Sequence, residues 1–253
     1  MMDSLSLPSQ NPIIDINVGV TSFDNNKFRT WNPLSDESIY NRGFLLNKIP
    51  SEISSTIDTE VNNLINSSNK IKVNHLLAGQ IEKEYQYTPS SLVLKYIQNL
   101  VGQYEDFSQG YLAKQIGKQF PDNTPIKLTT TPFWVNLQKK YEYNPIHDHS
   151  GILSFVIWHK VPFLYKDEVK QDPTEKYKLF SNPKIPVSVN GLFGFVYASS
   201  KGQIKTEYLP IDKNWEGYIA MFPADLFHLV NPFYTSDDYR ISISGNILID
   251  YKN

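Results

Sequence analysis

Apolar residues recur at helical spacing in two stretches of the first 120 residues. The first stretch follows Pro50, where Ser51 can cap a helix, and its apolar stripe consists of Ile53, Ile57, Val61, Leu64 and Ile65. The second follows Thr88-Pro89-Ser90-Ser91, and its stripe consists of Leu92, Tyr96, Leu100 and Tyr104. One apolar stripe among polar residues predicts a helix that docks through a single face. We therefore expect two helices that cover a sheet.

From about residue 126 onward the pattern takes the two-residue period of β-strands. Between residues 133 and 138, apolar side chains alternate with Trp134, Asn136 and Gln138. Further strands are predicted at residues 152–158, 187–198, 203–209, 215–222 and 239–251. Short strands with no helices between them indicate an antiparallel sandwich, and closure into a jelly roll protects the edges of such a sandwich.

The predicted fold class is mainly β, a double-stranded β-helix or jelly roll with an N-terminal helical extension. A chain of 253 residues suits one large domain. We expect residues 1–120 to form the extension packed on the barrel and residues 121–253 to form the core. Residues 163–184, rich in Lys, Asp, Glu and Pro, interrupt the strand series as an insertion, and loops of this length serve as lids or as tolerated decoration.

The composition limits which partners and which metal ligands the protein can have. The net charge is −2 and Lys and Arg form no dense block, so nothing in the sequence indicates a nucleic-acid partner. There is no cysteine, and therefore any metal ion must be held by His and carboxylate side chains. The amino terminus lacks the pattern of a signal peptide, and no apolar run approaches the roughly 20 residues of a membrane span. We expect a cytoplasmic protein that does not enter a membrane.

Two of the five histidines, His147 and His149, stand two positions apart just before an apolar strand. In an extended chain their side chains point to the same face, where two imidazoles can hold one metal ion if a third ligand comes from elsewhere. His228 lies in an otherwise apolar segment, residues 222–232. It suits either a hydrogen-bonded core histidine or that third ligand, and a polar turn would equally explain the first pair.

The last strand separates its residues by face. Isoleucines occupy one face, and Arg240, Ser242, Ser244 and Asn246 occupy the other, which is either a solvated surface or a binding surface. A guanidinium group binds a carboxylate through two hydrogen bonds, and a neighbouring hydroxyl can add a third. Arg240 with Ser242 is therefore a candidate carboxylate site.

At these residues the sequence resembles the iron(II)- and 2-oxoglutarate-dependent oxygenases, and more closely members that bacteriophages encode. The shared motifs are His-x-His before Leu-Ser-Phe-Val, and Phe-Pro-Ala…His…Pro-Phe…Arg-Ile-Ser-x-Ser-Gly-Asn near the end, within residues 131–246. Residues 75–81 also resemble a segment that precedes the barrel in those proteins.

The resemblance implies Fe(II), 2-oxoglutarate and O2, with His147 and His228 as iron ligands. It places the distal carboxylate of 2-oxoglutarate on Arg240 and Ser242. Asn136 is expected to line the same pocket, together with Trp134 and Tyr143, although Trp134 suits the core equally well.

One position departs from the family pattern. Where those oxygenases have Asp two residues after the first His, this chain has His149, with Asp148 beside it. Asp148 would bind the metal only if a bulge shifted the strand, and strand alternation favours His149. The expected ligands are therefore His147, His149 and His228.

The implied activity is hydroxylation of a small or macromolecular substrate with release of succinate and CO2. One alternative is a cupin-like, metal-binding jelly roll without 2-oxoglutarate chemistry that serves ligand binding or assembly. Another is a cupin-type oxygenase or isomerase that binds its substrate directly through three histidines. Dependence of cosubstrate binding on Arg240 separates these readings. The sequence specifies neither the substrate nor the oligomeric state.

Overall fold

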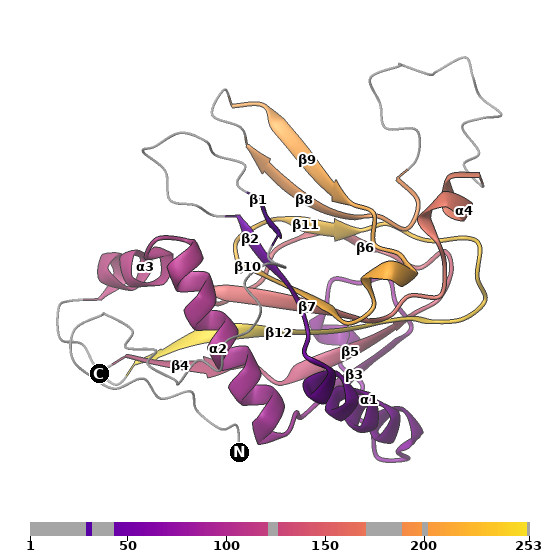
Figure 1. Ribbon diagram of the computed structural model, residues 1–253, viewed down its shortest axis with the longest axis horizontal. Coiled ribbons are helices and arrows are strands. Elements are labelled where there is room, and N and C mark those ends of the chain that lie inside the picture. The colour runs from indigo at the N-terminus through magenta and orange to yellow at the C-terminus, as the bar shows by residue number, and fades with distance from the viewer. Residues whose placement is uncertain (1–28, 32–42, 121–125, 171–188, 199–201, 252–253) are drawn as a thin grey trace.

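Two antiparallel β-sheets face each other, and helices cover the outer face of the larger sheet (Figure 1). This computed structural model describes residues 29–31, 43–120, 126–170, 189–198 and 202–251. The strands are β1 (Arg29–Trp31), β2 (Phe44–Lys48), β3 (Lys83–Tyr87), β4 (Ile126–Thr130), β5 (Phe133–Gln138), β6 (Asn144–His147), β7 (Leu153–Lys160), β8 (Phe193–Ala198), β9 (Ile204–Leu209), β10 (Tyr218–Pro223), β11 (His228–Val230) and β12 (Arg240–Tyr251). The helices are α1 (Ser51–Asn66), α2 (Ser91–Phe107), α3 (Tyr111–Gln119) and α4 (Tyr165–Lys170), with 3-10 turns at η2 (Asn74–Leu76) and η4 (Lys213–Trp215).

The larger sheet has the strand order β1-β2-β10-β7-β12-β5-β3, and β4 pairs with the far end of β12. The smaller sheet has the order β6-β11-β8-β9. Neighbouring strands are often distant in sequence, as in a jelly roll, because from β5 onward the chain passes back and forth between the sheets, with β8 and β9 as the one consecutive pair in the same sheet. This arrangement confirms the predicted mainly-β jelly roll with helices contributed by the N-terminal part.

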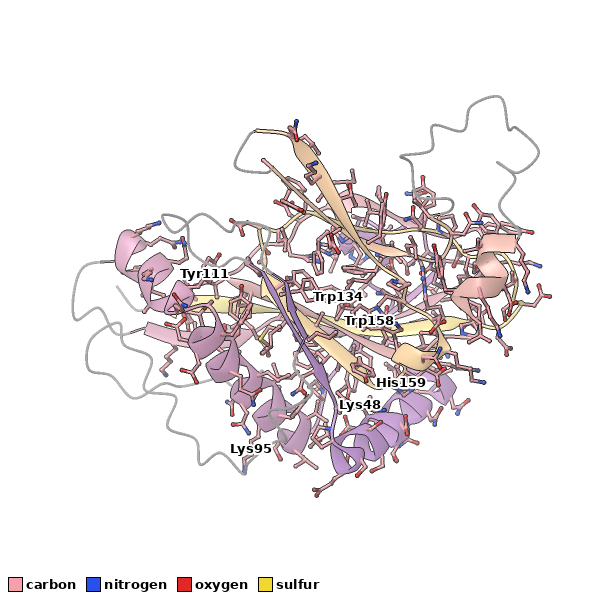
Figure 2. The ribbon with its side chains drawn as sticks, turned by 45° about the horizontal axis from the view of Figure 1, so that its top comes forward. Lys48, Lys95, Tyr111, Trp134, Trp158 and His159 are labelled. Carbon is pink, nitrogen blue, oxygen red and sulfur yellow. The ribbon has the colours of Figure 1, made fainter. Side chains whose placement is uncertain are left out.

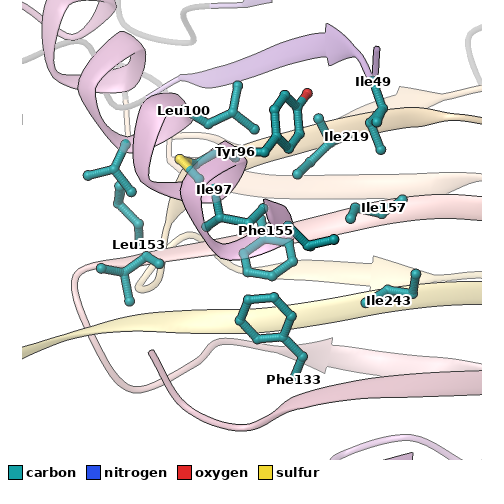
Figure 3. Packing of buried hydrophobic residues seen from close by; sticks show 14 of the residues in the cluster. Ile49, Tyr96, Ile97, Leu100, Phe133, Leu153, Phe155, Ile157, Ile219 and Ile243 are labelled. Carbon is teal, nitrogen blue, oxygen red and sulfur yellow. The ribbon is translucent and has the colours of Figure 1, made fainter. Parts of the chain in front are cut away.

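Strand alternation divides the interior into two apolar cores. On β12, Ile241, Ile243 and Ile247 belong to the core beneath the helices, whereas Arg240 and Ser242 lie on the opposite face. Figure 3 shows the residues of α2 stacked over those of the larger sheet. The rings of Phe133 and Phe155 meet edge to face there, with centroids 4.8 Å apart. The second core lies between the two sheets and contains Trp158, Phe193, Phe195 and Phe222.

The N-terminal part contributes more than helices. β2 pairs with β10, and β3 pairs with β5, so both are strands of the larger sheet. The first convincing element was expected only after Pro50. The sequence did not predict β2, because both of its faces are covered. Phe44, Leu45 and Leu46 therefore form a continuous apolar run that shows no alternation.

Details of the helices also differ from the expectations. α1 begins at Ser51, but Pro50 holds the N-cap position and no side chain caps the helix. Ser90 caps α2 by accepting a hydrogen bond from the Val93 amide. The predicted insertion begins with the short helix α4, and residues 171–184 lie outside the described residues. None of the helices in the described part is long and apolar enough to cross a bilayer.

Candidate metal centre

Three histidines meet where the smaller sheet faces the larger one. His147 ends β6 and lies directly opposite His228, the first residue of β11. The potential donor nitrogens of His147, His149 and His228 all lie within 4.8 Å of one another. Their ring centroids are separated by 4.2 to 5.0 Å. Three imidazoles at this spacing form a donor set for one divalent transition-metal ion.

Backbone carbonyl groups determine which ring nitrogen of His147 and His228 is available to a metal ion. Nδ1 of His147 lies 2.7 Å from the carbonyl oxygen of Pro145, and Nδ1 of His228 lies 3.0 Å from that of Leu226. Because a carbonyl oxygen only accepts, each Nδ1 carries the proton and donates it. The lone pair of each ring is therefore on Nε2, the nitrogen left for a metal ion.

Burial keeps the three rings neutral. It lowers the pKa of His149 to about 4, with the proximity of His147 as a second cause. Burial also lowers the pKa of His228 far below its ordinary value. For His147 burial lowers the pKa, while the Pro145 carbonyl and Asp148 oppose the shift. Neutral imidazoles are the form that binds metal, so no proton has to leave at neutral pH.

His149, not Asp148, joins the cluster. Its ring lies 5.6 Å from the indole of Trp134, and its amide donates to the Ala224 carbonyl at 2.9 Å. That hydrogen bond ties the chain after β6 to the turn that precedes His228. Asp148 is exposed and lies outside the cluster of three donors. The third donor that the geometry offers is thus an imidazole.

The pocket of the histidines continues along the floor of the larger sheet. The residues that line both it and the neighbouring pocket of Arg240 are Asn136, Asn144, Val156, Phe193, Val230 and Ser242. Asn136 and Ser242 stand opposite each other on β5 and β12, and Nδ2 of Asn136 donates to Oγ of Ser242 at 3.2 Å. The pocket of the histidines and the pocket of Arg240 therefore adjoin and share these wall residues.

Arg240 is only 3% exposed and is held by neutral groups. Its Nε and Nη2 donate to Oε1 of Gln138 at 3.0 and 2.8 Å. Nη1 donates to the Gly191 carbonyl at 2.8 Å, and Nη2 also donates to the Asn231 carbonyl at 2.9 Å. Burial lowers the pKa of Arg240 to about 9, so the guanidinium stays charged at neutral pH.

No carboxylate in the described part of the chain forms an ion pair with Arg240. The charge of the buried Glu168 carboxyl raises the pKa of Arg240 without an ion pair, and the Glu168 oxygens accept instead from the amides of Tyr234 and Thr235. An anionic ligand would give Arg240 a direct charged partner, since carboxylates pair with guanidinium groups. The rings of Phe163 and Phe233, 5.6 and 5.5 Å from the guanidinium carbon, keep this end of the pocket apolar.

The structure brings most of the predicted site residues together. His147, His149, His228, Asn136 and Ser242 line one pocket, and Arg240 lines the adjoining one. Trp134 also lines the pocket, and it lies in the interior with Trp158 (Figure 2). Tyr143 does not line the pocket: its side chain is 43% exposed, because residue 143 precedes β6 and only its carbonyl faces inward, accepting from the Gln80 amide.

Three polar residues of the site were not singled out from the sequence. Gln138 orients Arg240, and Asn144 and Glu84 line the pocket of the histidines. Gln138 shares the inward parity of Trp134 and Asn136, which was a usable signal. Glu84 gave no comparable signal, because β3 was not recognised as a strand.

Residues 132–246 match the model of the protein family described as "Putative 2OG-Fe(II) oxygenase". The comparison with curated proteins gives no match. Among solved structures, the chain is similar to a prolyl-4-hydroxylase of Pseudomonas putida, with 10% sequence identity, a TM-score of 0.43 and coverage of 81% of this chain and 91% of that one. It is also similar to a Trichoplax adhaerens prolyl hydroxylase in complex with a peptide fragment of the hypoxia inducible factor oxygen degradation domain, with 14% identity, a TM-score of 0.46 and 83% coverage of both chains.

Proposed function

We propose that this chain, whose residues 132–246 match the 2OG-Fe(II) oxygenase model, hydroxylates an organic substrate while 2-oxoglutarate and O2 become succinate and CO2. One oxygen atom enters succinate and the other enters the new hydroxyl group, which balances the reaction. The observation that supports this proposal is the pair of adjoining pockets, one lined by the neutral imidazoles and the other by a buried guanidinium.

His147, His149 and His228 would hold the iron. When bound, Fe(II) supplies the activation of O2 that is coupled to decarboxylation of 2-oxoglutarate. The protein contributes a preset tautomer at His147 and His228, because the carbonyl groups of Pro145 and Leu226 retain the Nδ1 protons. It also contributes an apolar surround, which excludes water from the reacting atoms.

Arg240 and Ser242 would bind the distal carboxylate of 2-oxoglutarate. Four of the five guanidinium hydrogens are used by Gln138, Gly191 and Asn231, which leaves one hydrogen on Nη1 for a ligand. The hydroxyl of Ser242 accepts from Asn136, so its own proton is free to donate to the same carboxylate. Gln138 keeps the guanidinium plane fixed before the cosubstrate arrives.

A metal-binding jelly roll without 2-oxoglutarate chemistry is the second candidate. The observation in its favour is His149, an imidazole where the oxygenase pattern has a carboxylate. The buried Arg240, which forms no ion pair among the described residues and keeps one guanidinium hydrogen unused, favours the oxygenase, because a structural barrel needs no such group.

The test compares wild type with Arg240→Lys, which keeps the charge but loses the planar fork. We would incubate each protein with Fe(II), 2-oxoglutarate and O2 and measure succinate, and measure 2-oxoglutarate affinity in parallel by anaerobic calorimetry. The oxygenase predicts 2-oxoglutarate binding that weakens by about tenfold or more in the variant. Stoichiometric iron uptake without any affinity for 2-oxoglutarate would instead support the metal-binding jelly roll.

The cytoplasmic location and the bacteriophage origin suggested by the sequence remain predictions, as does the choice between a small and a macromolecular substrate. The bacteriophage origin is proposed on the resemblance described above. Fractionation of the expressing cells would test the location.

A further inference from the structure

Three acceptor oxygens in the pocket of the histidines have no hydrogen-bond partner. They are Oε2 of Glu84, Oδ1 of Asn136 and Oδ1 of Asn144, and each is buried among the described residues. Glu84 as a whole is only 1% exposed. Leaving a buried acceptor unpaired costs about 1 to 3 kcal/mol, so three in one pocket indicate a missing donor rather than chance.

The fold holds these groups close to one another. Glu84 stands opposite Asn136, and Asn136 stands opposite Ser242, across β3, β5 and β12. A Cβ atom added at Gly79 would lie 2.5 Å from Oδ1 of Asn144 and 3.0 Å from Oε1 of Glu84. Residue 79 therefore packs directly over both side chains, and the glycine is what allows the close approach.

No cation in the described part of the chain forms an ion pair with Glu84. Burial raises its pKa to about 7, and the negative charge of nearby Glu142 adds to the shift. A carboxylate in this setting gains most from a positively charged partner supplied by a ligand.

The cosubstrate cannot supply the missing donors. At neutral pH both carboxylates and the keto group of 2-oxoglutarate only accept hydrogen bonds, and an iron ion donates none. Its negative charge would also repel Glu84, whereas Arg240 in the adjoining pocket attracts it. Bound water can donate to these oxygens but carries no positive charge, so the primary substrate is the occupant that can supply both N–H donors and a charge opposite to that of Glu84.

We propose that Glu84 and Asn144 recognise a cationic nitrogen of the primary substrate, a guanidinium or ammonium group that donates N–H bonds. This assignment rests on the proposed oxygenase function. Leu77, Trp134 and Phe222 line the same pocket and suit an apolar stem beneath the charged group. Arg240 thus selects the anionic cosubstrate and Glu84 selects a cationic substrate.

The experiment uses the anaerobic complex of the full chain with Fe(II) and 2-oxoglutarate. Calorimetry or ligand-observed NMR measures the affinity of three probes of similar shape: n-butylguanidinium, neutral n-butylurea and anionic pentanoate. We expect the cation to bind at least about tenfold more tightly than n-butylurea, with pentanoate weakest. Glu84→Gln should remove that preference by weakening only the cationic probe.

The matched control is Glu82→Gln, which removes the same charge two residues away from a side chain that is 61% exposed. It should retain the wild-type preference within about twofold, since exposed charges contribute little. Affinities for iron and 2-oxoglutarate, measured separately on all three proteins, should not fall below the wild-type values.

Equal binding of the cation and n-butylurea, absent binding of the cation, or an unchanged preference in Glu84→Gln would overturn the assignment while leaving the oxygenase intact. Failure of wild type to bind iron or 2-oxoglutarate would overturn the proposed function, and with it the assignment. The two failures are therefore distinguishable.

Discussion

His147 and His228 face each other across β6 and β11, with ring centroids 4.2 Å apart. Each ring donates from Nδ1 to the carbonyl oxygen two residues before it in the chain, Pro145 or Leu226. The two strands thus repeat one local geometry, which leaves Nε2 of both rings free within the same cluster. His149 completes the cluster from just beyond β6.

Removing the third imidazole should disrupt metal binding. We expect His149→Ala to weaken Fe(II) affinity by about 100-fold or more, because the ion loses one of three protein ligands. Asp148→Ala should change the affinity by less than about threefold, because this carboxylate is exposed and outside the cluster. Anaerobic Fe(II) titration of both variants measures this. The reverse order of effects would mean that a bulge brings Asp148 to the metal.

Arg240 and Ser242 should contribute unequally to cosubstrate affinity. Arg240→Lys should weaken 2-oxoglutarate binding by about 10- to 100-fold, because a hydrogen bond to a charged group contributes about 1.5 to 3 kcal/mol. Ser242→Ala should cost about threefold to tenfold, since it loses one neutral donor. Calorimetry on the iron-loaded proteins gives both values, and iron affinity serves as the control. If iron affinity fell equally, the variants would have disturbed the fold rather than the carboxylate site.

The sequence contained enough to locate the metal centre but not the pocket around it. His147, His149 and His228 were identified because strand parity and their position among apolar segments are local signals. Gln138 and Asn144 acquire their roles only when β5 and β6 meet β12 and β11, and such long-range pairings leave no mark on the local pattern.

Glu84 illustrates the same limit for the fold. The segment Lys83-Glu84-Tyr85-Gln86-Tyr87 alternates in the manner of a strand, but it lies between the two predicted helices and was assigned to the helical extension. Its partner β5 follows about fifty residues later, and a pairing of that range cannot be read from spacing alone. The jelly roll itself could be predicted because most of its strands follow one another with turn signals between them.

Glu84→Gln should stabilise the protein at high pH. The pKa of the carboxyl rises from 4.5 to about 7 on folding, so between these values the unfolded chain releases a proton that the folded chain keeps. Stability therefore falls as pH rises through this window, and glutamine removes the effect. We expect the metal-free variant to be more stable than wild type by about 1 to 3 kcal/mol at pH 8, and by less than about 1 kcal/mol at pH 5.

Denaturant unfolding at the two pH values measures this difference. Greater stability combined with loss of cation binding would show that the variant lost a recognition group and not its fold. A variant that is less stable than wild type at pH 8 would contradict the uncompensated burial of Glu84.

Two glycine substitutions should have opposite effects on stability. A Cβ atom at Gly245 on β12 would lie 2.6 Å from a ring carbon of Phe133 and 2.9 Å from the ring of Phe155. Gly245→Ala should destabilise the protein by about 1 to 3 kcal/mol through overpacking. Gly117→Ala in α3, where nothing lies within 4 Å, should stabilise by about 0.5 to 1 kcal/mol. Equal unfolding midpoints for both variants would contradict the packing of β12 against these rings.

The central claim is that two adjoining pockets hold Fe(II) on three histidines and 2-oxoglutarate on Arg240. The most direct measurement is an anaerobic titration of Fe(II) and then 2-oxoglutarate into the metal-free protein, monitored by the visible charge-transfer band of the chelate. We predict a band with one equivalent of each component in wild type, its loss in His149→Ala, and a higher 2-oxoglutarate requirement in Arg240→Lys. Stoichiometric iron binding with no band at saturating 2-oxoglutarate would contradict the claim.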